Sequence, residues 1–175
     1  MKFRYFYLLF FLASVQVQAY DFGDGSIKIP EGFEGPVTQS MGQGVSATAY
    51  TYPHDSNTGT LLQITTWNPG QSFPQMTNEE LKVGSEQYLL QFLSGVQRKR
   101  DSFKKSEVEF IQVSGQPVAK IKWSGAIQGK EVHGIMYCLI YNSKIYSFHT
   151  QDFSSFKGKY TQLAVSAFES IELKR

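Results

Sequence analysis

The sequence lacks most of the features that would stabilise or modify it covalently. It contains one cysteine, Cys138, so no disulfide can form within the chain. No Asn-x-Ser/Thr acceptor for N-glycosylation occurs, since Asn142-Ser143-Lys144 fails the spacing. Repeats, low-complexity tracts and long linkers are also missing, which predicts a single domain. Its stability must therefore come from packing, to which the 15% of aromatic residues can contribute.

Long hydrophobic runs are absent except at the start, where Tyr5 to Leu12 is apolar throughout. This run is too short to span a bilayer, follows a cationic start and precedes small residues ending at Ala19. The pattern predicts a signal peptide over residues 1–19, cleaved after Ala19, and a mature domain over 20–175. No cysteine follows the cleavage site to carry a lipid. We therefore expect a periplasmic or secreted protein without a stable membrane anchor.

The expected mature domain also lacks a net charge. The chain has 17 Lys and Arg against 15 Asp and Glu, and Lys2 and Arg4 lie in the leader. Nucleic acids and anionic membranes bind clustered positive surfaces. Neither is therefore expected as a partner. The basic run Arg98-Lys99-Arg100 is interpreted as the solvated end of a helix, where cations favour the negative end of the helix dipole.

Alternating and β-rich segments predict the strands. One is expected over residues 26–29, a hairpin over 45–67, and four successive strands over 107–150 that form an antiparallel meander. The last strands are apolar on both faces, so both faces of the sheet need cover.

Two helices supply this cover in the expected fold. Thr77 and Glu80 form a capping box, which predicts a helix from there to about Asp101. A second helix is expected over about 155–168. The sequence thus predicts an α+β fold in which an antiparallel sheet of about six strands carries helices on both faces, an α/β/α sandwich.

A two-residue turn at Asn142-Ser143 fixes the register of the last hairpin. It places Cys138 diagonally from His149 on one face, and His133 opposite Asp152. A Cys–His enzyme is conceivable from this geometry. Nothing in an apolar strand lowers the pKa of the thiol, however, so an inert Cys138 is favoured. No catalytic residue, metal site or cofactor is therefore assigned.

Three parts of the sequence resemble the PsbP-like and DcrB-like α/β/α sandwich proteins. They are Ile27 to Phe33, Tyr141 to Phe148, and Ser170 to Leu173, together with the long helix that follows a strand pair. The resemblance implies a non-enzymatic role through protein contact, because members of this group include an extrinsic photosystem II subunit, envelope proteins and chaperones. It offers no site motif, so no functional residue is carried over.

Apolar side chains in an expected loop provide the predicted partner-binding surface. They flank the Pro-rich turn before the first helix and are Trp67, Phe73 and Met76. The leading hypothesis is a monomeric envelope protein that binds another envelope or secreted protein, as an accessory subunit, chaperone or immunity-type inhibitor. The alternative is a carrier of a small apolar ligand, in a pocket between sheet and helix lined by Tyr88, Phe92 and Tyr137. An enzyme that uses Cys138 and His149 is the third.

Overall fold

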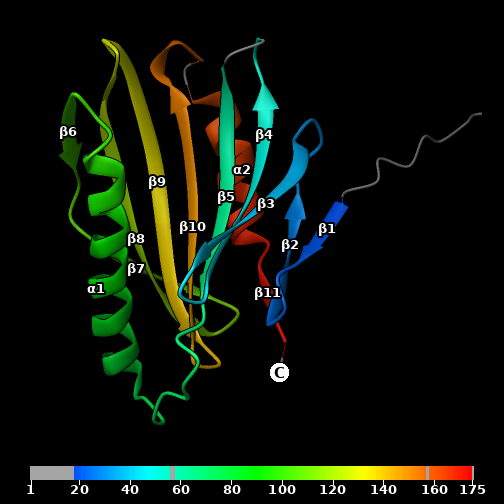
Figure 1. The fold of residues 1–175 in the computed structure, drawn as a ribbon, viewed down its shortest axis with the longest axis vertical. Coiled ribbons are helices and arrows are strands. Elements are labelled where there is room, and N and C mark those ends of the chain that lie inside the picture. The colour runs from blue at the N-terminus through cyan, green and yellow to red at the C-terminus, as the bar shows by residue number, and fades with distance from the viewer. Residues whose placement is uncertain (1–17, 56–57, 157, 175) are drawn as a thin grey trace, which may run out of the picture.

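A computed structural model of the chain describes residues 18–55, 58–156 and 158–174. The predicted leader therefore lies outside the described residues, except for Gln18 and Ala19, which are exposed and belong to the first strand. The elements, shown in Figure 1, are in chain order β1 (Gln18–Asp21), β2 (Gly25–Ile29), β3 (Glu34–Gly42), β4 (Val45–Pro53), β5 (Gly59–Trp67), α1 (Asn78–Gln97), β6 (Ser102–Lys105), β7 (Glu109–Val113), β8 (Gln116–Ile127), β9 (Lys130–Tyr141), β10 (Lys144–Phe153), a 3₁₀ turn (Ser154–Phe156), α2 (Lys159–Glu169) and β11 (Glu172–Leu173).

The main sheet has eight antiparallel strands in the order β3-β4-β5-β10-β9-β8-β6, and β7 also pairs with β8. The expected hairpin over 45–67 is confirmed as β4 and β5, and the expected meander as β7 to β10. The expected count of about six strands was wrong. Sequence reasoning missed β3, a Gly- and Pro-containing strand at one edge, and β6, a four-residue strand at the other.

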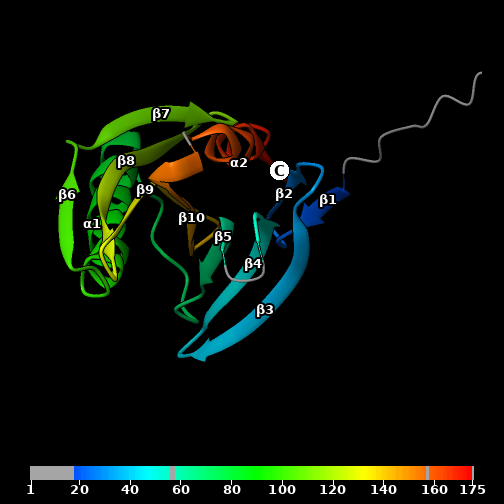
Figure 2. The same ribbon diagram turned by 90° about the horizontal axis from the view of Figure 1, so that it is seen from above.

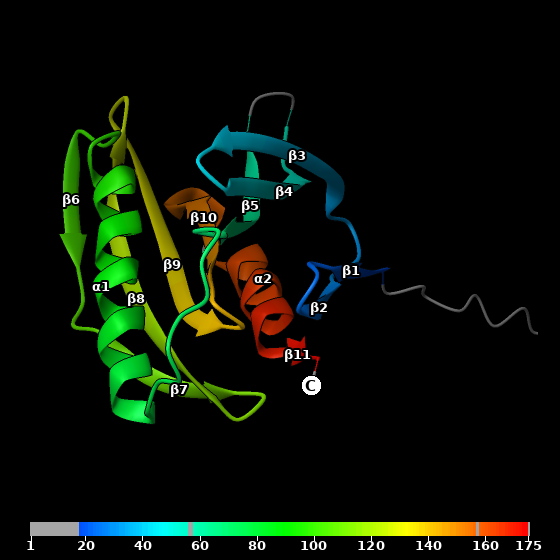
Figure 3. The same cartoon turned by 60° about the horizontal axis from the view of Figure 1, so that its bottom comes forward.

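A second, three-stranded sheet has the order β1-β2-β11. The strand expected over 26–29 exists, but it belongs to this small sheet. Figure 2 shows α1 on one face of the main sheet and α2 on the other. Figure 3 shows that α2 and the small sheet lie side by side, so they share one face of the main sheet. The expected α/β/α sandwich is therefore corrected in part: in the described part of the chain α1 and α2 lie on opposite faces of an eight-stranded sheet, and a small second sheet shares one of these faces with α2.

The strand β9 lies at the boundary between two hydrophobic cores. Leu139 packs with Phe168 of α2 in one core, while Cys138 packs with Leu89 of α1 in the other. All four side chains are buried. Successive residues of a strand point to opposite faces. The predicted two-sided burial of these strands is thus confirmed.

The capping box at the start of α1 is confirmed. The Thr77 hydroxyl accepts from the Glu80 amide at 3.3 Å, and the Glu80 carboxylate accepts from the Thr77 amide at 2.7 Å. The helix ends at Gln97, before the expected Asp101, because the Asp101 amide already donates to the Ala126 carbonyl of the sheet. Neither helix in the described part of the chain is long and apolar enough to cross a membrane.

Candidate functional site

A hollow of about 190 Å³ lies where the loop between β5 and α1 meets the β9–β10 turn. We call it the notch. Its lining comes from the loop, the first turn of α1, the start of β8 and the β9–β10 turn, namely Phe73, Pro74, Met76, Leu81, Gln116, Ile140, Tyr141, Asn142 and Ser143. It thus contains two of the three residues that the sequence predicted for partner binding, Phe73 and Met76.

The β9–β10 turn holds the loop in place. Asn142 and Ser143 both have positive φ, 47° and 60°, as a two-residue turn between twisted strands requires. The Ser143 hydroxyl accepts a hydrogen bond from the Phe73 amide at 2.8 Å. The loop is therefore fixed to the sheet at the residue that supplies the largest apolar side chain of the notch. A fixed rim lowers the ordering cost of binding.

The lining of the notch is uncharged. Its apolar part consists of Phe73, Pro74, Met76, Leu81 and Ile140, and its polar part is contributed by the amides and hydroxyls around the turn. An apolar cavity of roughly 150 Å³ admits a benzene molecule. The notch therefore has room for one aromatic or large aliphatic side chain, and it has no ionic group that would pair with a charged one.

Trp67, the third residue predicted for partner binding, lies outside this lining. Its ring packs edge-to-face on Tyr88 of α1, with ring centroids 5.4 Å apart. Trp67 is half-buried at the end of β5 and belongs to the core below α1. The structure therefore brings Phe73 and Met76 together and places Trp67 in a helix–sheet contact.

The residues predicted to line a ligand pocket do not share a face. Tyr88 and Phe92 pack on the α1 side of the sheet, whereas Tyr137 packs against Phe168 of α2 on the other side. They cannot line one pocket. The cavity beside Tyr137 measures about 10 Å³, roughly the space of one water molecule. Burial also raises the pKa of Tyr137 to about 12, so its hydroxyl stays neutral.

Cys138 and His149 have the predicted diagonal placement, since Met136 faces His149 and Cys138 faces Ser147. In the described part of the chain no hydrogen bond joins them. Cys138 is fully buried, and burial raises the pKa of its thiol far above the ordinary value. Burial, and to a lesser degree Arg100, lowers the pKa of His149 to about 3. A neutral imidazole beside a protonated, inaccessible thiol does not form a nucleophilic pair.

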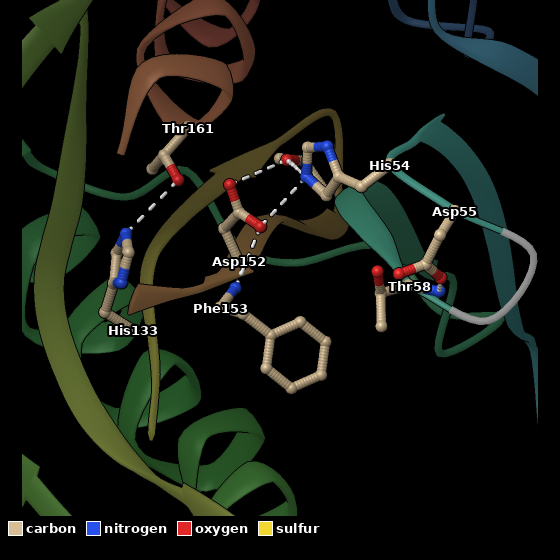
Figure 4. Close-up of polar contacts among 8 residues, drawn as sticks. His54, Asp55, Thr58, His133, Asp152, Phe153 and Thr161 are labelled. Atoms are coloured by element: carbon tan, nitrogen blue, oxygen red, sulfur yellow. Dashed lines mark hydrogen bonds and ion pairs between the residues drawn. The ribbon is translucent and has the colours of Figure 1, made fainter. Parts of the chain in front are cut away.

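A second polar cluster, shown in Figure 4, joins the β4–β5 turn to the end of β10. The Asp152 carboxylate lies 3.2 Å from His54 Nε2 and accepts from the Thr60 hydroxyl at 2.8 Å and the Phe153 amide at 2.8 Å. The side chains of His54 and Asp152 are 3% and 0% exposed. His133 faces Asp152 in the strand register, as predicted, but its ring contacts Thr161 of α2 at 3.4 Å. The predicted His133–Asp152 pair is replaced by His54–Asp152.

The directions of the hydrogen bonds in this cluster indicate that its role is structural. Thr60 gives its only hydroxyl hydrogen to Asp152, so at 3.0 Å it can only accept from His54 Nε2. The hydroxyl nearest the imidazole is thus not available as a nucleophile. The His54 ring also stacks on Phe156, with centroids 3.6 Å apart. The cluster fixes the β4–β5 turn against the 3₁₀ turn, and it satisfies the buried carboxylate.

Half of the notch comes from segments that are distant in the sequence and was not predicted. Leu81 lies in the predicted first helix, but nothing in the sequence placed Ile140 or Ser143 beside Phe73. The residues of Figure 4 were also missed as a group, because His54 and Asp152 are far apart in the sequence.

Sequence comparisons give no relative. No protein-family model matches the chain, and no curated protein matches it. Solved structures do match. LpqN of Mycobacterium tuberculosis, described as involved in cell envelope biogenesis, aligns with a TM-score of 0.58 and 14% identity over 90% of each chain.

Two further structures align over 90% of this chain. The cyanobacterial PsbP protein of Synechocystis gives a TM-score of 0.58 and 12% identity, with 92% of its own length covered. PA94 of Pseudomonas aeruginosa, a protein of unknown function described as a putative regulator, gives 0.55 and 9%, with 97% covered. At these identities the likeness concerns the fold alone. The chain has a PsbP-like fold, as its sequence predicted.

Proposed function

Because this PsbP-like chain carries a predicted export signal, we propose that it is an exported envelope protein that acts without catalysis by binding another protein. The likeness to LpqN, which is described as acting in cell envelope biogenesis, supports the envelope as its location. The poor fit of Cys138 and His149 to a nucleophilic pair supports a binding role. The accessory-subunit, chaperone and inhibitor roles expected from the sequence all use such contact.

The notch is the observation that carries this proposal. It combines an apolar floor, an uncharged polar rim and a backbone fixed by the Phe73–Ser143 hydrogen bond. Binding energy in protein interfaces concentrates where one anchor side chain fills a preformed apolar pocket. The partner we propose therefore inserts one aromatic or large aliphatic side chain between Phe73, Met76 and Ile140.

Site-specific photocrosslinking tests the notch. A photoreactive phenylalanine replaces Phe73 in cells that export the full chain, and the matched control replaces Phe110, an aromatic residue of β7 that is 41% exposed and lies outside the notch lining. We expect one discrete protein adduct from position 73 and none from position 110. Absence of an adduct at 73, or the same adduct in equal yield at 110, contradicts the proposal.

A charge in the notch provides the second arm of this test. Met76→Lys places an ammonium group in the apolar lining, whereas Val83→Lys places the same group at a 65% exposed position of α1. We expect Met76→Lys to abolish the adduct at position 73 and Val83→Lys to leave it. An adduct that survives Met76→Lys would assign binding to another surface. Native mass spectrometry of the purified chain separates a protein partner from a small apolar ligand, which would appear as a discrete added mass.

Export is tested independently. The amino-terminal residue of the protein recovered from the envelope is expected to be Tyr20. The cut removes Gln18 and Ala19 from β1 and leaves the pairs of Tyr20 with Ile27 and of Asp21 with Ser26. Recovery of an intact chain that retains Met1 inside the cell would contradict the envelope location.

A further inference from the structure

The strand β3 forms an open edge of the main sheet. It is the last strand in the order and pairs only with β4 among the described residues. All nine of its residues are exposed, and Val37 and Met41 are 71% and 65% exposed. Figure 2 shows β3 at the rim of the molecule, with its outer side facing away from both helices. An unpaired strand edge presents backbone donors and acceptors to any strand that can align with it.

This edge lacks the usual protection by charge. Natural edge strands often carry Lys or other charged residues that prevent pairing with another strand. Residues 35–42 read Gly-Pro-Val-Thr-Gln-Ser-Met-Gly and contain no charged side chain. A second strand can therefore approach without burying an unpaired charge.

The sequence of β3 is complementary to itself when it is read in the opposite direction about Gln39. Antiparallel pairing centred there places Gln39 opposite Gln39 of a second copy, Val37 opposite Met41, and Thr38 opposite Ser40. Apolar residues then meet apolar ones and hydroxyls meet hydroxyls, and these are the cross-strand pairs that stabilise sheets. We infer that two copies of this chain associate through β3, with a two-fold axis at Gln39 that joins their eight-stranded sheets.

The faces of the strand agree with this pairing. Val37 and Gln39 lie opposite Ala49 and Ala47 of β4, and therefore point to one face of the sheet. Thr38 points to the other face, where its hydroxyl lies 3.0 Å from that of Thr48. Residues that face each other across antiparallel strands share a face. Val37 of each copy thus lies on the face of Gln39, and Met41, its partner across the axis, is the extra residue of the irregularity between Ser40 and Gly42.

The irregular ends of β3 limit the length of the pairing. Its register with β4 shifts between Glu34 and Val37 and again between Ser40 and Gly42. Bulges of this kind end regular pairing. The regular pairing is therefore short, about residues 38–40 with Val37 and Met41 at its ends, and a stable interface commonly buries roughly 1,200–2,000 Å². We expect reversible association that increases with protein concentration, in contrast to the monomer that the sequence analysis expected.

Cysteine crosslinking tests the axis. Gln39→Cys places two thiols opposite each other in the dimer, and the native Cys138 is buried and does not compete. Lys104→Cys is the matched control, because Lys104 is exposed on β6 at the other edge of the same sheet. On mild oxidation of the mature chain we expect a disulfide-linked dimer from Gln39→Cys at much higher yield than from Lys104→Cys. Equal yields from the two variants would overturn the inference.

Charge at the axis gives the second test. Gln39→Lys brings two ammonium groups together, while Thr51→Lys adds the same charge to an exposed position of β4, one strand inward. In sedimentation velocity over a range of concentrations, we expect self-association in the native chain and in Thr51→Lys, and its loss in Gln39→Lys. A dimer that persists in Gln39→Lys, or a native chain that stays monomeric and does not crosslink at position 39, overturns the proposal. Crosslinking of position 39 to a different protein would assign the edge to another partner and would also overturn it.

Discussion

The two edges of the main sheet are built in opposite ways. At one edge two short strands share the outer side of β8, with β6 on its residues 123–126 and β7 on its residues 116–120. The strand β6 has four residues, two of which are Lys104 and Lys105. At the other edge β3 has nine residues and one charge, Glu34. The first, the closed edge, is protected by short length and charge, whereas the second, the open edge, is long and uncharged from Gly35 to Gly42 and is protected only near its ends, by Pro36 and two irregularities.

The side chains next to the two edge strands also differ, being large and buried beside β6 and small and half-buried beside β3. Behind β6, Trp123 is 3% exposed and stacks on Phe103, and the guanidinium of Arg100 lies 5.1 Å from its ring centre. Behind β3, the face that carries Val37 continues through Ala47 and Ala49, which are small and only half-buried. Large side chains at the closed edge supply stability, and the open edge keeps surface for contact.

The largest effect expected from this difference is at Trp123. Trp123→Ala removes a buried ring beneath the closed edge and should lower the free energy of unfolding by about 3–5 kcal/mol. Urea denaturation of the purified native chain and of the variant measures this loss. If the free energy of unfolding falls by less than about 1 kcal/mol, the large side chains at this edge do not supply the stability we expect.

His149, on the central strand β10 with its ring 5.7 Å from that of Trp123, should make the stability of the sheet respond to acid. The pKa of His149 is about 3 in the folded chain, because burial and then Arg100 disfavour its charged form, and about 6.5 when unfolded. The unfolded chain therefore binds the extra proton between these values. The contribution of neutral His149 to the free energy of unfolding should be fully present above about pH 6.5. Below that pH it should fall by up to about 1.4 kcal/mol per pH unit.

The variant His149→Gln removes this proton uptake and should flatten the decline of stability between pH 6.5 and 4. Ser147→Ala, on the same strand and face, should keep the slope of the native chain. Denaturant midpoints across this pH range measure both. An unchanged slope in His149→Gln would show that His149 does not cause the acid response.

A smaller effect is expected from Asp24, which belongs to neither edge. Its carboxylate fixes the loop between β1 and β2 to the middle of the main sheet, through Lys144 at 2.8 Å and Tyr146 at 2.5 Å. Burial raises the pKa of Asp24, but hydrogen bonds from Lys144, Tyr146 and Asn142 outweigh it, so the pKa is lowered. The stabilisation should be present above about pH 4 and lost as pH falls further.

Asp24→Asn should therefore cost about 1–2 kcal/mol at neutral pH, with a difference from the native chain that shrinks in acid. Thermal unfolding at pH 7 and pH 3 measures this change. A difference of the same size at both pH values would mean that the charge of Asp24 does not contribute.

The smallest effect on stability is expected at the open edge. Val37→Thr keeps the β-branched shape at a 71% exposed position and should change the free energy of unfolding by less than about 0.5 kcal/mol. Self-association in sedimentation velocity should nevertheless weaken, since Val37 faces Met41 in the proposed dimer. A stability loss as large as that of Trp123→Ala would erase the distinction between the two edges.

Local signals allowed the middle of the molecule to be predicted. The capping box set the start of α1, and the Asn142-Ser143 turn fixed the register of β9 and β10. Both features depend on residues that are close in sequence. The end of α1 was less predictable, because its last turn is replaced by a hydrogen bond from Asp101 to Ala126 of the sheet.

The edges and the small sheet could not be predicted in the same way. Gly35, Pro36 and Gly42 give β3 the composition of a loop, and it becomes a strand only by pairing with β4. Prolines in sheets favour edge strands, which is the signal that could have identified it. For the notch, Phe73 and Met76 followed from apolar residues in a loop, whereas Ile140 is contributed by a strand more than sixty residues later.

The small sheet has a consequence for how the chain reaches its final form. Its central strand β2 pairs on one side with β1 and on the other with β11, and the Lys174 amide donates to the Asp24 carbonyl at 2.9 Å. A chain that enters the envelope amino-terminus first holds the opening segments of this sheet long before residues 172–174 arrive. If the chain is exported as proposed, this sheet can close only after residues 172–174 have crossed the membrane, and until then β2 has one side vacant.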